Sequence, residues 1–142
     1  MAHVTTPYLI ALTPEAREVL PEPSLPLRSL PMRFGRDLRA RSRFRLGSER
    51  RRGGATGPND IYLAEQGPPH RLSREHFLVG REGNRFYVED RESACGTMVD
   101  GDRVGGARRG GRIFLKHGDT IVAGGQHSPW AFRFHADGTP PG

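Results

Sequence analysis

The sequence predicts an all-β domain made of many short strands joined by turns and long loops. Hydrophobic residues make up 35% of the 142 residues, whereas glycine (19 residues) and proline (12 residues) are abundant. This mixture is typical of short strands with frequent turns. Near the C-terminus, Trp130, Phe132 and Phe134 alternate with smaller or polar residues, as in a strand that is buried on one face. The length fits one domain with one core.

The N-terminal part of the chain predicts a strand, a helical turn and a second strand. Tyr8 to Thr13 is a short apolar run and predicts the first strand. Thr13 can cap a helical turn that begins at Pro14, and the prolines that follow prevent a longer helix. Arg28 to Phe34 predicts the second strand, which ends at Gly35.

Residues 37–58 are predicted to form a long basic insertion loop. The segment is first arginine-rich and then glycine-rich, and ten arginines fall between Arg28 and Arg52. It contains few core-forming residues, so we expect most of it to lie outside the core. Phe44 and Leu46 could still form a short strand or pack on the rim of the domain.

The middle of the chain predicts three strands around a polar loop. Ile61 to Leu63 follows the turn former Asn59. A Gly-Pro-Pro sequence then opens the polar loop. After this loop, His76 to Gly80 is expected to pair with Arg85 to Glu89 as a hairpin.

The C-terminal third predicts strands around a tight turn and a second basic loop. Asp100-Gly101 is a strong signal for a tight turn between two short strands. Residues 105–111 form an Arg/Gly-rich loop. The strands that complete the sheet are expected at Arg112 to Leu115, Thr120 to Ala123 and Trp130 to His135.

The charge of the chain favours an anionic partner. The formal net charge is +6, and it comes almost wholly from arginine, because Lys116 is the only lysine. Arginine's planar fork suits bidentate pairing with phosphate, and a positive field speeds association with anions. Charge alone leaves a phosphopeptide, an acidic protein and nucleic acid open.

Other features of the sequence exclude several classes. No apolar run approaches the length of a membrane span, and no signal peptide is evident at the N-terminus. The single Cys95 excludes an internal disulfide and a cysteine-based metal site. We therefore expect a cytoplasmic domain that has no metal or other cofactor and does not associate with a membrane.

Five short motifs follow one another along the chain: Phe34-Gly35-Arg36, Asn59-Asp60-Ile61, Ser73-Arg74-Glu75-His76, Gly96-Thr97 with Asp100-Gly101, and Gly118-Asp119. In this order they resemble the forkhead-associated (FHA) domain. Each motif is weak by itself, whereas five in register are specific. The resemblance covers about residues 8–134, nearly the whole chain.

The resemblance implies an FHA/SMAD-like two-sheet β-sandwich of about ten or eleven short strands, with long basic loops. It also implies a module that binds phosphothreonine in partner proteins and catalyses nothing. We expect an N-terminal tail (1–7), one FHA-like domain (8–135, including the insertion 37–58) and a C-terminal tail (136–142). Such a chain resembles a bacterial-type stand-alone module that signals in a Ser/Thr kinase pathway. Its partner would be a substrate of such a kinase, and its oligomeric state stays open.

The resemblance also assigns roles to residues. The phosphopeptide would contact Arg36, Ser73 and Arg74, and also the opposite loop, which contains Cys95, Gly96 and Thr97. Further residues would shape the loops, with His76 pinning the loop that presents the serine; these residues are Gly35, Asn59, His76, Asp100 and Gly101.

Two features of this sequence weaken the assignment. Many family members place an asparagine before the Gly-Thr pair, where it holds the peptide backbone, but here the two preceding residues are Ala94 and Cys95. Neither offers an amide's paired donor and acceptor. Leu46-Gly47-Ser48 could also be the true strand end in place of Gly35-Arg36. We prefer Arg36, because it directly follows a strand-like segment and a glycine.

Three other functions stay open beside phosphothreonine binding. The fold could bind an unphosphorylated protein. Its Arg/Gly-rich stretches, Arg50 to Gly54 and Arg108 to Arg112, could bind nucleic acid, although aromatic residues are not interleaved with them. An enzyme would need Cys95 or Ser73 as the nucleophile and His76 as the base.

Overall fold

The computed structural model describes residues 6–20, 22, 24–37, 58–65 and 69–136. Apart from its end residues 37 and 58, the predicted basic insertion lies outside these residues, as do Leu46-Gly47-Ser48 and Phe44. The described part contains one short helix, α1 (Pro14–Val19), and eleven strands: β1 (Tyr8–Ala11), β2 (Ser24–Pro26), β3 (Met32–Arg36), β4 (Ile61–Leu63), β5 (Phe77–Glu82), β6 (Arg85–Asp90), β7 (Thr97–Val99), β8 (Asp102–Val104), β9 (Gly111–Leu115), β10 (Thr120–Ala123) and β11 (Ala131–His135).

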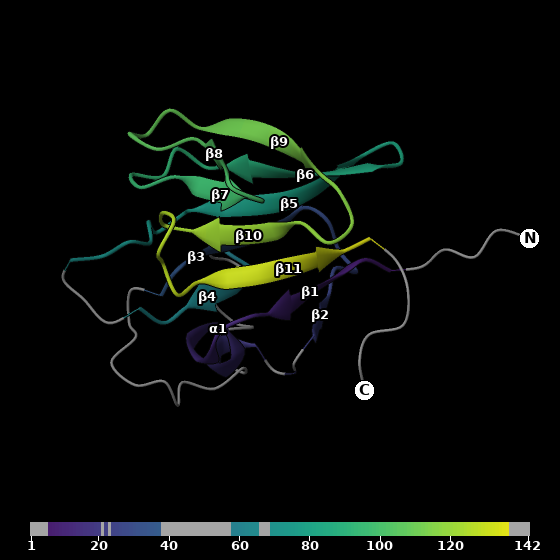
Figure 1. The fold of residues 1–142 in the computed structure, drawn as a ribbon, viewed down its shortest axis with the longest axis horizontal. Helices are drawn as coiled ribbons and strands as arrows, with labels where there is room; N and C mark the ends of the chain where they lie inside the picture. Colours follow the sequence, from purple (N-terminus) through teal and green to yellow (C-terminus); the bar gives the residue numbers. More distant parts are fainter. Residues whose placement is uncertain (1–5, 21, 23, 38–57, 66–68, 137–142) are drawn as a thin grey trace, which may run out of the picture.

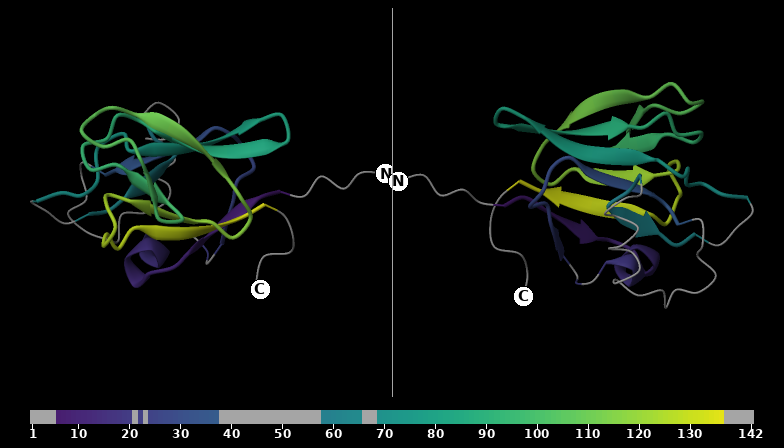
Figure 2. Two further views of the ribbon diagram at one scale, coloured as in Figure 1. Left: turned by 45° about the horizontal axis from the view of Figure 1, so that its top comes forward. Right: turned by 180° about the vertical axis from the view of Figure 1, so that it is seen from behind.

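The strands form two sheets that pack face to face (Figures 1 and 2). The six-stranded sheet has the order β2-β1-β11-β10-β7-β8, and the five-stranded sheet has the order β4-β3-β5-β6-β9. Neighbouring strands run antiparallel, except for the parallel pair of β3 and β4. The prediction of an all-β, two-sheet β-sandwich with about eleven strands is confirmed.

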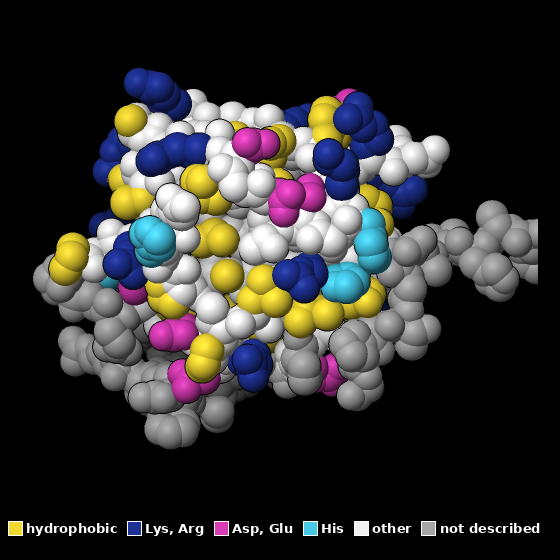
Figure 3. Space-filling model, in the orientation of Figure 1, with side chains coloured by type: hydrophobic (Ala, Val, Ile, Leu, Met, Phe, Trp, Pro, Cys, Tyr) yellow, Lys and Arg dark blue, Asp and Glu magenta, His cyan; other side chains and the backbone are white. Residues whose placement is uncertain are grey.

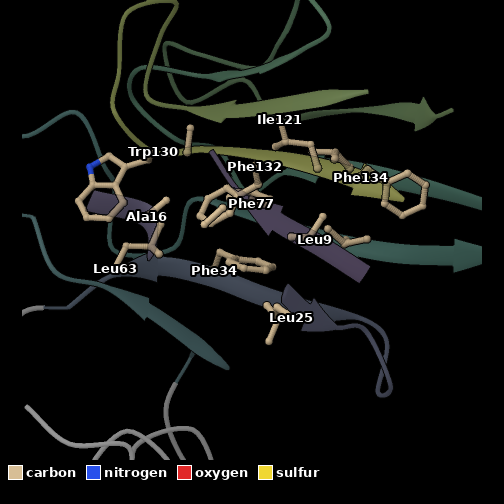
Figure 4. Close-up of a cluster of buried hydrophobic side chains, with 14 of the residues drawn as sticks. Leu9, Ala16, Leu25, Phe34, Leu63, Phe77, Ile121, Trp130, Phe132 and Phe134 are labelled. Atoms are coloured by element: carbon tan, nitrogen blue, oxygen red, sulfur yellow. The ribbon is translucent and has the colours of Figure 1, made fainter. Parts of the chain in front are cut away.

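Aromatic side chains from both sheets fill the core (Figure 4). Phe34 of β3 stacks on Phe77 of β5, with ring centroids 4.5 Å apart, and meets Phe132 of the opposite sheet at 6.1 Å. Trp130, Phe132 and Phe134 are all buried, as their alternation predicts. Burial of these rings, together with the aliphatic side chains of the core, supplies the hydrophobic free energy that holds the two sheets together.

The N-terminal elements differ in part from their prediction. Thr13 caps α1 as expected, since its hydroxyl oxygen accepts a hydrogen bond from the Ala16 amide at 3.1 Å. The strand predicted from Arg28 begins only at Met32. The short strand β2 was not predicted, because it ends at a proline. The proline is tolerated because β2 is an edge strand that pairs only with β1.

The loops that follow β3, β4, β6 and β8 gather at one end of the sandwich, on the left in Figure 1. The motifs Asp100-Gly101 and Gly118-Asp119 lie instead in the β7–β8 and β9–β10 turns, away from this end. The outer ends of β1 and β11, at Tyr8 and His135, pair with each other at the opposite end. Among the described residues, no helix has the length and apolar character that a membrane span requires.

Candidate functional site

An open groove crosses the end of the sandwich where these loops meet. Its walls come from the end of β3, from the β4–β5 loop, and from the β6–β7 and β8–β9 loops, and they include Arg36, Ser73, Arg74, Ala94, Arg108 and Arg109. The floor extends over the outer face of the five-stranded sheet, past Leu78 of β5 and Arg112 of β9. Both polar and apolar side chains line it.

The backbone of the β4–β5 loop is held by side chains on both sides. The carboxylate of Glu65 accepts hydrogen bonds from the amides of Arg71 and Leu72, at 3.0 and 2.9 Å. The Leu72 side chain is buried and fixes the loop to the core. On the other side, Nδ2 of the buried Asn59 donates to the Arg74 carbonyl at 2.7 Å. The part of the loop from Arg71 to Arg74 is therefore held in place by the protein itself.

His76 ties this loop to the one opposite. It is fully buried, and its Nδ1 accepts a hydrogen bond from the Ser73 amide at 3.0 Å. The amide can only donate, so the ring proton lies on Nε2, which donates to the Gly96 carbonyl at 2.8 Å. Burial lowers the pKa of His76 below its usual 6.5, although the bond to Gly96 opposes this. The neutral imidazole is thus the form that the two loops require.

Arg36 points into the groove from the end of β3. Its amide donates to the Ser73 carbonyl at 2.9 Å, and its Nε donates to the Leu72 carbonyl at 3.1 Å. These bonds orient the guanidinium while leaving Nη2 free of hydrogen bonds within the described residues, and Nη1 lies 3.4 Å from Nε2 of His70. A guanidinium held by Nε can still offer N–H groups to an anion.

Gly35 allows the loop to approach β3 this closely. A Cβ at this position would lie 1.9 Å from the Arg74 carbonyl oxygen and 2.5 Å from Nδ2 of Asn59. Any larger residue would therefore push away the carbonyl and the amide that hold the loop.

Ser73 faces the groove beside the β6–β7 loop. Its Oγ accepts a hydrogen bond from the Ala94 amide at 3.0 Å. A hydroxyl that accepts in this way keeps its own proton to donate, so Ser73 can still bind an acceptor in the groove. Arg74, the next residue, is exposed, and its side chain makes no hydrogen bond within the part of the chain that the structure describes.

A buried carboxylate organises the β6–β7 loop. Asp90 accepts hydrogen bonds from the Ser93 amide (2.9 Å), the Ser93 hydroxyl (2.6 Å) and the Thr97 hydroxyl (2.9 Å). The Ser93 oxygen in turn accepts from the Gly96 amide at 2.9 Å. This network fixes the turn that presents Ala94 to Ser73.

A second polar network lies behind the β4–β5 loop. Arg91 donates from Nη1 to Oδ1 of Asn59 at 2.6 Å, and from Nη2 to Oε1 of Glu75 at 2.7 Å. Burial lowers the pKa of Arg91, and the charge of Glu75 opposes that shift. The guanidinium is thereby committed to protein groups and acts as a support for Asn59.

The structure brings only some of the predicted site residues to the groove. Arg36, Ser73 and Arg74 line it together, whereas Cys95, Gly96 and Thr97 are absent from its lining. Thr97 is fully buried, and Asp100 and Gly101 lie in the β7–β8 turn. Sequence reasoning missed four supporting residues: Glu65, Asp90, Arg91 and Ser93. The one available signal was the length of the polar stretch that follows β6.

The comparisons agree with this architecture. A family model described as FHA domain matches residues 32–124. Mycobacterium tuberculosis EmbR in complex with a low-affinity phosphopeptide is a similar solved structure, with 20% identity, a TM-score of 0.60, and coverage of 97% of this chain and 26% of that one. The chain therefore spans about a quarter of the EmbR chain.

Two other similar structures have nearly the same length as this chain. The FHA domain of CT664 from Chlamydia trachomatis has 16% identity and a TM-score of 0.57, covering 92% of this chain and 97% of that one. The N-terminal FHA domain of S. cerevisiae Rad53p, in complex with a phosphothreonine peptide, has 19% identity and a TM-score of 0.55, covering 91% and 90%. At these identities the likeness shows the fold alone. A search of curated proteins finds no match.

Proposed function

The chain belongs to the FHA domain family. We propose that it is a non-catalytic module that binds phosphothreonine in partner proteins through its end groove. One observation carries the proposal. Arg36 and Ser73 are both fixed by main-chain hydrogen bonds in the same groove, and both keep donors that no described residue uses. Structures in which EmbR and Rad53p bind phosphopeptides support it by analogy.

The chemistry of the groove suits a phosphate group. A phosphothreonine has a charge of roughly −1.5 to −2 at neutral pH and three strong acceptor oxygens. Arg36 supplies charge-assisted N–H donors, Ser73 supplies a hydroxyl, and the exposed Arg74 can reach a phosphate oxygen or a peptide carbonyl. Hydrogen bonds to charged groups contribute roughly 1.5–3 kcal/mol each, so removing any one of these three donors should lower the affinity measurably.

Ala94 and Cys95 shape the expected affinity. Ala94 takes part through its amide, which orients Ser73, and this role needs no side chain. Neither residue can hold the peptide backbone as an asparagine amide would. We therefore expect phosphopeptide binding that is weaker than in family members with this asparagine and that depends mainly on Arg36, Ser73 and Arg74.

The same geometry argues against catalysis. A general base for Ser73 or Cys95 must have a free ring nitrogen, whereas both nitrogens of His76 are occupied, by the Ser73 amide and the Gly96 carbonyl.

We propose that the partner is a substrate of a Ser/Thr kinase, and that binding takes place in the cytoplasm, where such kinases use ATP.

Nucleic-acid binding has less support. Of the two Arg/Gly-rich stretches, Arg50 to Gly54 lies outside the described residues. The aromatic rings near the other stretch are covered, because Arg112 lies 3.9 Å above Tyr87 and Arg85 lies 3.6 Å above Phe114. Bases would need such faces free for stacking.

Fluorescence anisotropy with peptide libraries tests the proposal. The central residue is threonine, phosphothreonine or phosphoserine, and titrations are run at two salt concentrations. We expect binding only to the phosphothreonine peptides and a loss of at least tenfold in Arg36→Ala. Arg36→Lys keeps the charge without the fork and should recover only part of the affinity. Arg133→Gln, an exposed change on the other sheet, is the charge-matched control.

Equal binding of threonine and phosphothreonine peptides would refute the proposal in favour of an unphosphorylated partner. If Arg36→Ala still binds the phosphothreonine peptides, another arginine must be the main phosphate-binding residue. Tight binding of single-stranded DNA or RNA that falls steeply with salt, without phosphopeptide binding, would replace the proposal with nucleic-acid recognition.

A further inference from the structure

The β8–β9 loop brings two more arginines to the groove. Arg108 and Arg109 line the same groove as Arg36 and Ser73, and both are exposed. Basic side chains gather at the end of the molecule where this loop lies, at the upper left of Figure 3. The assigned phosphate donors do not include these two residues, so their role is unexplained by the proposed function.

The position of these arginines is fixed by the loop that orients Ser73. The Ala107 amide donates to the Ala94 carbonyl at 2.8 Å, and the Arg108 amide donates to the Ser93 carbonyl at 3.0 Å. Ala94 itself donates to Ser73. A continuous chain of hydrogen bonds thus connects the β8–β9 loop to the phosphate site, so the backbone that carries the two arginines is held in a fixed position beside that site.

The backbone at this point adopts a conformation that its side chains disfavour. Ala107 and Arg108 have φ angles of 50° and 60°, and the Arg109 amide donates to the Gly106 carbonyl at 3.0 Å, which closes a type I′ turn. Glycine or asparagine is the usual residue in such a turn. An arginine at this position costs stability, and a strained residue at the edge of a groove points to a role of its side chain.

Among the described residues, some arginines of the groove are paired with acidic side chains, and others are free to bind a ligand. Arg91 pairs with Glu75, and Arg112 pairs with Glu82 and Glu89. Within the described residues, the side chains of Arg108 and Arg109 make neither a hydrogen bond nor an ion pair. Asp90 and Glu92 also line the groove, so what distinguishes Arg108 and Arg109 is not an excess of positive charge but guanidinium groups that are exposed and unpaired among the described residues.

We propose that Arg108 and Arg109 form a second anion subsite, which takes an acidic group of the same peptide on the side of the phosphothreonine that faces the β8–β9 loop. The group is either the carboxylate of an Asp or Glu or a second phosphate, since both offer the oxygen pair that guanidinium binds. This inference rests on the proposed function and adds a selectivity to it. The partner is then a protein whose phosphothreonine lies in an acidic or doubly phosphorylated segment.

The test compares three sets of phosphothreonine peptides by fluorescence anisotropy at one physiological salt concentration. The first has alanine at every flanking position, the second has aspartate scanned through the flanks, and the third has a second phosphothreonine scanned in the same way. We expect roughly a three- to tenfold gain in affinity at one or two positions on one side of the phosphothreonine. A larger gain from phosphate than from aspartate identifies the second phosphate as the preferred group.

Arg108→Gly separates binding from folding, because glycine suits the left-handed turn and should leave the melting temperature equal or higher. This variant and Arg109→Gln should each lose most of the gain while binding the alanine-flanked peptide within about twofold of wild type. Arg133→Gln, with the same change in net charge, should keep the gain.

Three outcomes overturn the inference. The first is an absence of gain at every position in the wild type. The second is a gain that persists in both Arg108→Gly and Arg109→Gln. The third is an equal loss of gain in Arg133→Gln, which would reduce the effect to net charge. Failure of the alanine-flanked phosphothreonine peptide to bind would instead refute the proposed function itself, and the second subsite with it.

Discussion

Replacing Gly35 with alanine tests whether the close approach of β3 to the β4–β5 loop holds the site together. The added Cβ would lie 1.9 Å from the Arg74 carbonyl oxygen and 2.5 and 2.7 Å from the two polar side-chain atoms of Asn59. The first neighbour is backbone and the second is a side chain that is 1% exposed, so neither can swing away into solvent. The loop must move as a whole.

The cost has two parts. Overpacking of this kind costs roughly 1–3 kcal/mol, and the displaced hydrogen bond from Asn59 to Arg74 adds roughly 1 kcal/mol. We therefore expect Gly35→Ala to lower the free energy of unfolding by about 3 kcal/mol, which corresponds to a fall of roughly 10 °C in melting temperature. Affinity for a phosphothreonine peptide should fall as well, because Ser73 and Arg74 move with the loop.

Gly80→Ala is the matched control. Gly80 is also a strand glycine of the five-stranded sheet, and its added Cβ would lie 2.4 Å from the end of the Tyr87 ring. That ring is half-buried on the outer face and can rotate, so the cost should stay below about 1 kcal/mol. Urea denaturation of the two variants beside wild type measures the difference. Equal losses, or a loss below about 1 kcal/mol in Gly35→Ala, would refute the reasoning.

Three further predictions concern stability. Burial lowers the pKa of His76 below 6.5, so as the pH falls this imidazole is protonated in the unfolded chain before it is protonated in the folded protein. The free energy of unfolding should therefore decrease below about pH 6.5, by up to about 1.4 kcal/mol per pH unit. In His76→Gln that slope should shrink to the part due to His135, whose pKa burial also lowers, and an unchanged urea-denaturation profile would contradict this. Asp90→Asn places an amide NH2 group among three hydrogen-bond donors, so it should lower the free energy of unfolding by roughly 1–3 kcal/mol, measured by thermal unfolding. An unchanged stability would mean that the hydrogen bonds from Ser93 and Thr97 contribute little. Asp100→Asn should raise the melting temperature by about 1–3 °C, because Asp100 has φ 50° in a tight turn before Gly101 and asparagine tolerates that conformation better; a lower melting temperature would count against it.

Local patterns predicted those parts of the fold that local chemistry determines. The alternation from Trp130 to Phe134 predicts a half-buried strand, and β11 lies there. Asp100-Gly101 predicts a tight turn, and both residues have positive φ angles between β7 and β8. Thr13 predicts a helix cap, because a threonine before a proline satisfies the free amides of a first turn.

Elements that depend on a distant partner were beyond local patterns. The strand β2 exists because Leu25 pairs with Leu9 of β1, and nothing within its three residues indicates a strand. The parallel pairing of β3 and β4 is equally non-local, since the two strands come together from either side of a long segment.

The same division applies to the site. Arg36, Ser73 and Arg74 come from short motifs and lie in one groove. Glu65, Asp90 and Arg91 are common surface residues in the sequence, and they acquire their roles only where the folded chain places backbone amides and Asn59 within hydrogen-bond reach. A supporting network of this kind has no fixed spacing, so the sequence offers no more than the polar stretch after β6 as a signal.

The position of β11 has a consequence for the order in which the chain folds. This last strand lies between β1 and β10, and Tyr8 pairs with His135 across almost the full length of the sequence. During synthesis β1 and β2 leave the exit tunnel long before β11, so the edge of β1 that pairs with β11 has no partner in that interval. Pairings between residues so far apart form slowly, because the loop entropy is lost before the contacts are gained. The six-stranded sheet can therefore close only after β11 has been synthesised, and until then the apolar side of β1 is exposed to non-native contacts.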